Sequence, residues 1–187
     1  MESYDLQSVA ELLAGEYVVN SNRSVCVIVK SELYQRKKEN NIMFRTIRKK
    51  KNEISIDTAK ALLQSSRRGV LAVNGDDGYP YAIPINYVYD DDAQKIYFHG
   101  ARAGHKVDAL RACDKVCFTV YGNETIKEED WAPFVQSVVV FGRCHLVESS
   151  ARATTLLKRF AMKYYPSEQL VDEEIAHAGK AVQIFEI

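Results

Sequence analysis

A period-two alternation of large and small side chains runs from Tyr79 to Tyr89 and restricts this stretch to an extended strand. The large residues stand at the odd positions, Tyr79, Tyr81, Ile83, Ile85, Tyr87 and Tyr89. Successive side chains of a strand point to opposite faces, so the two faces of this strand differ in character. The apolar run Val70–Val73 and the turn-forming run Asn74–Gly78 come directly before it, which predicts a β-hairpin.

The rest of the chain continues this rhythm of short strands and tight turns. Strands are predicted at 95–99, 116–121, 135–147 and 181–187. Helices are predicted after Asp57, after Gly104, and from Ser149 or Ser150 up to Pro166. This order favours a mainly β fold with flanking helices, and an antiparallel barrel rather than a doubly wound parallel sheet.

Length and composition limit the number of domains and the kinds of partner. A chain of 187 residues predicts one domain, which we place at 43–187, preceded by an N-terminal extension of unknown role at 1–42. Within this extension, Val25–Val29 is predicted as a short strand. The 25 Lys plus Arg residues balance 25 Asp plus Glu residues, so no overall field attracts nucleic acid or an anionic membrane.

The sequence contains no signal for membrane insertion, secretion or metal binding. Val25–Val29 is far shorter than the roughly 18 apolar residues of a membrane span, so no membrane partner is expected. The first residues lack the features of a secretory signal, and four scattered cysteines form no disulfide framework, which favours a cytoplasmic location. The spacing of Cys113 and Cys117 matches neither a zinc knuckle nor a redox motif, so no metal site is predicted.

The segment from Tyr97 to Lys106 contains the densest candidate chemistry. A strand ends there, Gly100 and Gly104 allow the backbone to turn closely, and Arg102, His105 and Lys106 gather at the start of a helix. The free N–H groups and the positive dipole end of a helix add to these cations, which together suit a phosphate group. The alternative is an ordinary polar turn that faces water.

Pro84 marks the neighbouring strand as an edge. Proline removes a ladder donor and therefore belongs at the edge of a sheet or at an opening. Ile83, Ile85, Asn86 and Tyr87 then offer backbone groups, an amide and an aromatic wall, which suit a flat heteroaromatic ring. The alternative is an edge strand with a polar outer face.

Four motifs in this order resemble the flavin-binding split barrels related to pyridoxamine 5'-phosphate oxidase, and within them the nitroimidazole-resistance branch. The motifs are Arg68-Gly69-Val70-Leu71, the run from Gly78 to Tyr87, the run from Ile96 to Ala101, and Gly104-His105-Lys106. The resemblance covers about Phe44 to Ile187, so the first 42 residues lie outside it.

The resemblance implies a six-stranded antiparallel split β-barrel that forms a homodimer, with one FMN in each of two clefts between the subunits. Lys106, His105 and Arg102 would hold the phosphate, Ile83, Pro84, Ile85, Asn86 and Tyr87 would flank the ring, and His99, Gly100 and Ala101 would form the adjoining wall. His99 takes the position linked with the active cleft, which makes it the candidate catalytic residue. Gln136 and Ser137 lie where relatives supply contacts from the partner subunit.

The function implied is an FMN-dependent oxidoreductase that reduces a small acceptor, with nitroimidazoles and other nitroaromatics as candidates and NADH or NADPH as a candidate donor. The cofactor carries the difficult chemistry, which agrees with the lack of an obvious acid/base dyad. Two alternatives stay open: a non-catalytic flavin-binding or sensing protein, and a pyridoxamine phosphate oxidase-like enzyme. The latter lacks the full set of basic groups that a second phosphate needs.

Overall fold

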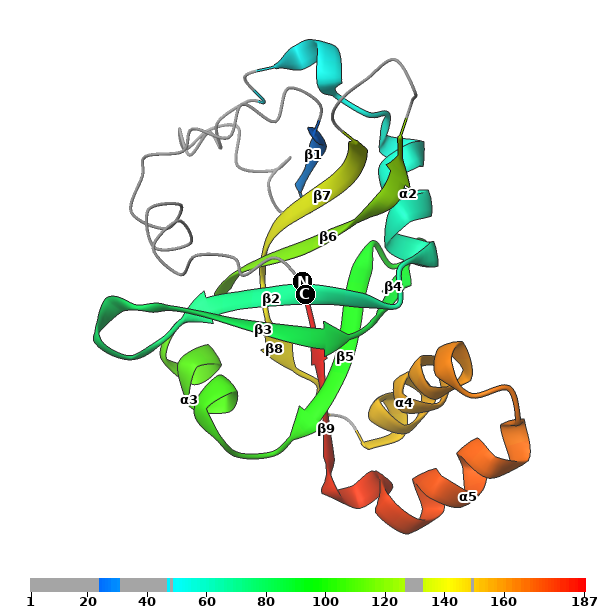
Figure 1. Ribbon diagram of the computed structural model, residues 1–187. Helices are drawn as coiled ribbons and strands as arrows, with labels where there is room; N and C mark the ends of the chain where they lie inside the picture. The colour runs from blue at the N-terminus through cyan, green and yellow to red at the C-terminus, as the bar shows by residue number, and fades with distance from the viewer. Residues whose placement is uncertain (1–23, 31–46, 48, 127–132, 149) are drawn as a thin grey trace, which may run out of the picture.

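The computed structural model describes residues 24–30, 47, 49–126, 133–148 and 150–187 (Figure 1). Nine strands of these residues form two sheets, with strand orders β1-β7-β6-β2-β3 and β4-β5-β9-β8. Four α-helices flank them, α2 (Ile56–Ser65), α3 (His105–Ala112), α4 (Ser150–Tyr164) and α5 (Glu168–Ala178). The strands are β1 (Ser24–Lys30), β2 (Arg68–Asn74), β3 (Pro80–Asn86), β4 (Val88–Asp90), β5 (Lys95–Ala101), β6 (Lys115–Thr125), β7 (Phe134–Arg143), β8 (His145–Leu146) and β9 (Val182–Glu186).

The predicted hairpin is confirmed. Strands β2 and β3 pair antiparallel, with Val70 opposite Pro84, and β3 is the edge strand that its prolines predict. The tight turn between them includes Asp77 and Gly78, both at positive φ. Large side chains of β3 face the core, while Pro80, Ala82, Pro84 and Asn86 are exposed on the other face.

Two strands that the sequence predicts as continuous are broken, and each break carries the chain from one sheet into the other. Tyr87 separates β3 from β4, because its N–H group donates to the hydroxyl of Tyr164. Cys144 separates β7 from β8, because its N–H group donates to the carbonyl of Asp114 instead of a neighbouring strand.

These breaks correct the expected count of six strands. Six extended segments are present, but two of them are divided and β1 is added, which gives the nine described strands. The fold is also not wholly antiparallel, because β1 pairs parallel with β7. Of the predicted N-terminal extension, this strand is the described part, and the other residues up to 42 lie outside the described ranges.

The main core lies between the two sheets and is closed at one end by α2. Ala59, Leu62 and Leu63 of this helix are buried, and its N-cap is Ser55, two residues before the expected Asp57. The rings of Phe98 and Phe185 stack at 4.8 Å in the centre of the core.

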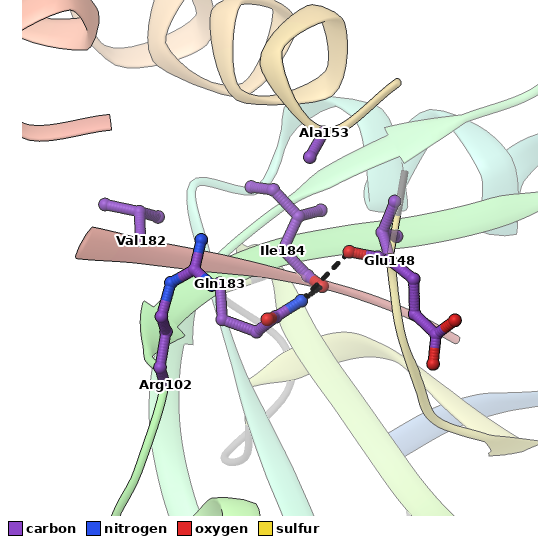
Figure 2. Close-up of a pocket in the computed structure, with 7 residues that line it drawn as sticks. Arg102, Glu148, Ala153, Val182, Gln183 and Ile184 are labelled. Carbon is purple, nitrogen blue, oxygen red and sulfur yellow. Dashed lines mark hydrogen bonds between the residues drawn. The ribbon is translucent and has the colours of Figure 1, made fainter. Parts of the chain in front are cut away.

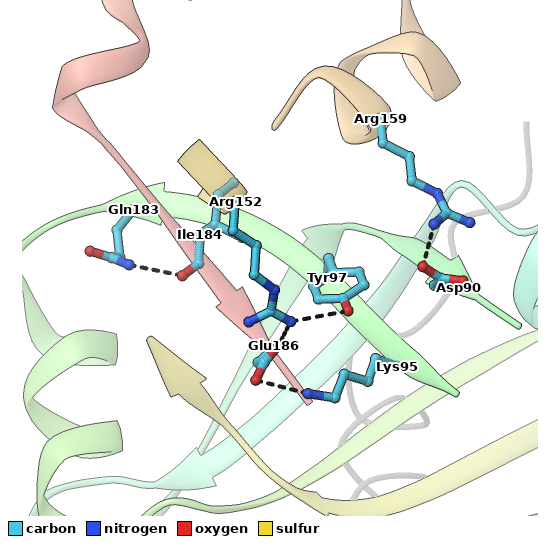
Figure 3. A network of polar contacts seen from close by, with 8 residues as sticks. All are labelled: Asp90, Lys95, Tyr97, Arg152, Arg159, Gln183, Ile184 and Glu186. Carbon is cyan, nitrogen blue, oxygen red and sulfur yellow. Dashed lines mark hydrogen bonds and ion pairs between the residues drawn. The ribbon is translucent and has the colours of Figure 1, made fainter. Parts of the chain in front are cut away.

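Helix α4 is held against the four-stranded sheet by a smaller apolar cluster and by ion pairs. Leu156 and Phe160 are buried there. Glu186 of β9 accepts hydrogen bonds from Lys95 at 2.9 Å and from Arg152 of α4 at 2.5 Å, and Arg159 pairs with Asp90 (Figure 3). Burial opposes ionisation of Glu186, but the two cations outweigh this and lower its pKa.

Candidate functional site

The turn between β5 and α3 places Arg102, His105 and Lys106 within five residues. Strand β5 ends at Ala101, and Gly104 adopts φ +118, a conformation that side chains rarely permit. The carbonyl of Gly104 accepts the N–H groups of Val107 and Asp108, so the N–H groups of His105 and Lys106 precede the helical ladder. The backbone therefore has the strand-turn-helix form that the sequence predicts for anion binding.

Lys106 folds back over the core. Its ammonium group lies 5.3 Å from the ring centre of Phe98 and 5.5 Å from that of Phe185. A Cβ atom at Gly100 would meet Nζ at 2.8 Å, so a larger residue there would make the ammonium group of Lys106 move from this position. Burial lowers the pKa of Lys106, and no carboxylate of the described residues pairs with it. The site thus contains a half-buried cation that lacks an anionic neighbour.

His105 turns toward the hairpin instead. Its ring stacks on Tyr81 of β3 at 4.3 Å with an interplanar angle of 13°, and Nε2 lies 3.4 Å from a carboxylate oxygen of Asp76. This contact places the start of α3 directly beside the proline-bearing strand, as the functional interpretation requires. It also points His105 and Lys106 in different directions.

Arg102 takes a third direction, into a pocket of about 380 Å³ between β9 and the start of α4. Figure 2 shows Arg102 and Glu148 on opposite sides of this pocket with Gln183 between them. The amide of Gln183 donates to the carbonyls of Val147 and Ile184, which fixes this side chain. The three predicted phosphate ligands therefore do not converge in this chain.

The residues predicted to flank a ring divide between the two faces of β3. Pro84 and Asn86 are exposed on the outer face, Ile83 is half-buried, and Ile85 is buried. Tyr87 is fully buried, donates its hydroxyl to the carbonyl of Leu63 and lies edge-on to a core ring. Its backbone N–H and C=O groups both contact the hydroxyl of Tyr164, so the predicted role of Tyr87 as a wall is not supported.

His99 lies between Lys106 of the turn and helix α4. It is opposite Ile184 in the β5–β9 ladder, and its ring packs edge-to-face on Phe160 at 4.5 Å. Burial and the charge of Lys106 lower its pKa, so the imidazole is neutral near pH 7. Gly100 and Ala101 continue this strand toward the turn.

Gln136 and Ser137 lie near the start of β7, where that strand adjoins β6 and β1. Gln136 accepts a hydrogen bond from Asn123 at 2.7 Å. Figure 1 shows this end of β7 beside α2, at the opposite end of the molecule from α3. Neither residue joins the turn between β5 and α3.

Phe185 and Tyr81 are the site residues that the sequence analysis did not assign. Phe185 supplies a ring beneath Lys106 from the last strand, and Tyr81 carries the stacked His105. Tyr81 was marked only as a large residue of the alternating strand. Its partner is set by how α3 docks, which no local pattern indicates.

Fold and site together describe a small two-sheet protein with a turn rich in basic residues beside an exposed edge strand. A family model described as pyridoxamine 5'-phosphate oxidase matches residues 55–185, and the chain belongs to this family. This confirms the broader resemblance that the motifs indicate. No curated protein matches the chain.

Several solved structures share the fold. A proposed 5-nitroimidazole antibiotic resistance protein from Bacteroides thetaiotaomicron is 16% identical with a TM-score of 0.58, covering 71% of this chain and 78% of that chain. A hypothetical protein from Mycobacterium tuberculosis is 21% identical with a TM-score of 0.57, covering 72% and 79%. An FAD and heme binding protein from Mycobacterium smegmatis is 18% identical with a TM-score of 0.56, covering 71% and 65%.

The helices give no sign of a membrane span. Among the described residues, none of them combines the length and the apolar character that crossing a bilayer requires.

Proposed function

We propose that this protein is an FMN-dependent oxidoreductase that passes electrons from NADH or NADPH to a small acceptor, with nitroimidazoles and other nitroaromatics as the candidate acceptor class. The observation that carries the proposal is Lys106, a half-buried ammonium group without a carboxylate partner among the described residues. Holding such a cation without an anion is costly, so its position favours a bound anionic ligand.

The residues of the turn fit the phosphate end of FMN. Lys106 would supply a charge-assisted hydrogen bond, and the first N–H groups of α3 would add the positive end of its dipole. His105 and Arg102 are both exposed and change rotamer at low cost, so we assign them to the same phosphate in the bound state.

The edge strand fits the ring system. The exposed face of β3 carries Pro84 and Asn86 but no charged residue, and we assign the segment Ile83 to Asn86 to the ring. Bound flavin would supply reversible hydride and electron transfer, while the protein orients the ring and tunes it. His99, neutral near pH 7, would donate or accept a hydrogen bond there rather than act as a fixed charge.

A homodimer would complete the cleft. The exposed face of β3 has no covering wall among the described residues, and the pocket at Arg102 lies on another side of the turn. Gln136 and Ser137 are too far along the molecule to serve the cleft of their own protomer, which supports their assignment to the partner's flavin.

The names of two structural relatives support a flavin and this class of acceptor. One relative is described as an FAD and heme binding protein, and another as a proposed nitroimidazole resistance protein. Extraction of the bound ligand distinguishes FMN from FAD.

The decisive experiment is the visible spectrum of the purified protein, followed by extraction and identification of its ligand. We expect a yellow protein that releases FMN, is bleached by NADH or NADPH without oxygen, and is reoxidised by a nitroimidazole. A yellow protein that no donor bleaches would instead be a flavin-binding or sensing protein. A colourless protein that FMN does not reconstitute would reject the proposal.

Oligomeric state gives a second check. Dilution to the monomer should release the flavin, because each cleft needs both chains. A monomer that keeps its flavin tightly would reject the shared cleft.

A further inference from the structure

Strand β1 lies at the edge of the five-stranded sheet. The other four strands, β7, β6, β2 and β3, pair with one another without it. The family model begins at residue 55, whereas β1 ends at Lys30. Strand β1 is the terminal strand of its sheet, so β7 is its single strand neighbour within the described ranges. Its pairing is parallel, unlike every other strand pair in the described part of the chain. It therefore reaches the edge by a long connection rather than through a hairpin.

The strand covers a long apolar edge. Seven residue pairs join β1 to β7, from Ser24 opposite Val135 to Lys30 opposite Phe141. The covered part of β7 includes the run Val138–Phe141, three valines and a phenylalanine, which have high strand propensity. Without β1, alternate residues of this edge would present unpaired N–H and C=O groups, and edges of that kind readily take up another strand.

We propose that this outer edge of β7, residues 135–141, is a strand-binding site for an extended apolar peptide, and that residues 24–30 occupy it as an intramolecular ligand. The backbone of the occupant supplies the affinity, and the parallel register sets its direction. A flexible tether gives an attached strand an effective concentration of about a millimolar. If β1 binds the edge with an intrinsic dissociation constant of about 10 μM, the tethered strand weakens the apparent binding of a free copy by about a hundredfold.

The register links this edge to the proposed flavin contacts. Val25 lies opposite Gln136, and Cys26 lies opposite Ser137. Any strand that replaces β1 would therefore lie along the residues that we assign to the partner's flavin. This link rests on the proposed function, whereas the strand-binding site itself does not.

A peptide-binding experiment tests the site in the full-length protein. Val27→Pro together with Ile28→Pro should release β1, because neighbouring residues of a strand turn their N–H groups to opposite sides and one of the two must face β7. Val27→Thr together with Ile28→Thr is the control, since threonine keeps both the N–H group and the strand propensity.

Fluorescence anisotropy of a labelled peptide with the sequence of Ser24–Lys30 gives the readout. We expect saturable binding to the proline variant and at least tenfold weaker binding to the wild type and the threonine control. Equal binding to all three proteins would overturn the proposal. The absence of binding to a proline variant that keeps its circular dichroism and thermal transition would also overturn it.

Hydrogen exchange in the wild type keeps the proposal testable if the proline variant does not fold. A displaceable β1 predicts that β7 amides facing β1 exchange together with the amides of β1, and at least tenfold faster than β7 amides facing β6. Equal protection on both sides of β7 would show that β1 is an integral strand and would contradict the proposal. Neither measurement needs a flavin, so a colourless protein would leave this test intact.

Discussion

The hydroxyl group of Tyr164 lies 2.7 Å from the backbone nitrogen of Tyr87 and accepts its hydrogen bond. The same hydroxyl lies 2.5 Å from the carbonyl of Arg67 and 2.7 Å from the carbonyl of Tyr87, and it donates its single proton to one of them at a time. One side chain at the end of α4 thus satisfies backbone groups from two other segments, at the point where β3 leaves the first sheet and β4 joins the second. The break in the predicted strand depends on this contact.

Replacing Tyr164 by phenylalanine tests that dependence. The backbone N–H group of Tyr87 would lose its acceptor in a partly buried position, which costs about 1–3 kcal/mol of unfolding free energy. Tyr165→Phe is the matched control, because Tyr165 is 62% exposed and its change should stay within about 0.5 kcal/mol. Urea denaturation of both variants measures the difference, and equal losses would refute the role of the Tyr164 hydroxyl.

Gly69→Ala probes the close approach of β2 to the core. A Cβ atom at Gly69 would lie 2.3 Å from Cζ of Phe118 and 2.9 Å from the carbonyl oxygen of Thr119, so the strand must shift. We expect a loss of about 1–3 kcal/mol. At Gly122 the nearest neighbour is a terminal methyl of Leu62 at 3.4 Å, so Gly122→Ala should cost less. Thermal denaturation compares the two, and a Gly122→Ala variant less stable than Gly69→Ala would contradict the packing.

Lys163 predicts a pH-dependent contribution to stability. Its ammonium group donates to the carbonyl of Ser66, the C-cap of α2, and lies 4.4 Å from the ring centre of Tyr87. Burial, with a smaller effect of Arg67, lowers the pKa of Lys163 to about 8. Between that pH and the ordinary lysine pKa the unfolded chain binds more protons than the folded one, so stability rises with pH in this window.

The comparison with Lys163→Met isolates this effect. The unfolding free energy of the wild type minus that of the variant should be flat below pH 8 and rise by about 1 kcal/mol toward pH 9.5, allowing for partial solvent screening. Urea titrations at pH 7, 8, 9 and 9.5 measure it. A difference that stays constant or falls over this range would show that Lys163 keeps an ordinary pKa.

Local sequence patterns predict most strands and helices of this fold. They do not predict where strands break or which strands pair. The alternation from Tyr79 to Tyr89 predicts the hairpin and both of its faces, because a strand with one buried face leaves that signature in any context. The breaks at Tyr87 and Cys144 depend on Tyr164 and on the carbonyl of Asp114, which approach only in the folded chain. The parallel pairing of β1 is likewise a choice of partner that its own sequence does not encode.

In the candidate site, the sequence likewise predicts the residues that are present but not their arrangement. The clustering of Arg102, His105 and Lys106 in the chain predicts a cationic turn, and the structure contains that turn beside β3. The direction of each side chain is set by distant elements, Phe185 for Lys106, Tyr81 for His105 and the pocket of β9 for Arg102. Sequence spacing therefore predicts which groups are available but not where each one points.

Flavin affinity of Lys106→Ala tests the central claim most directly. With Lys115→Ala as the control, an exposed lysine on β6, fluorescence titration of the apoproteins with FMN measures both dissociation constants. Losing a charge-assisted contact should weaken binding by about tenfold to a hundredfold in Lys106→Ala and leave Lys115→Ala at the wild-type value. An unchanged FMN affinity in folded Lys106→Ala would contradict the assignment of this turn as the phosphate site.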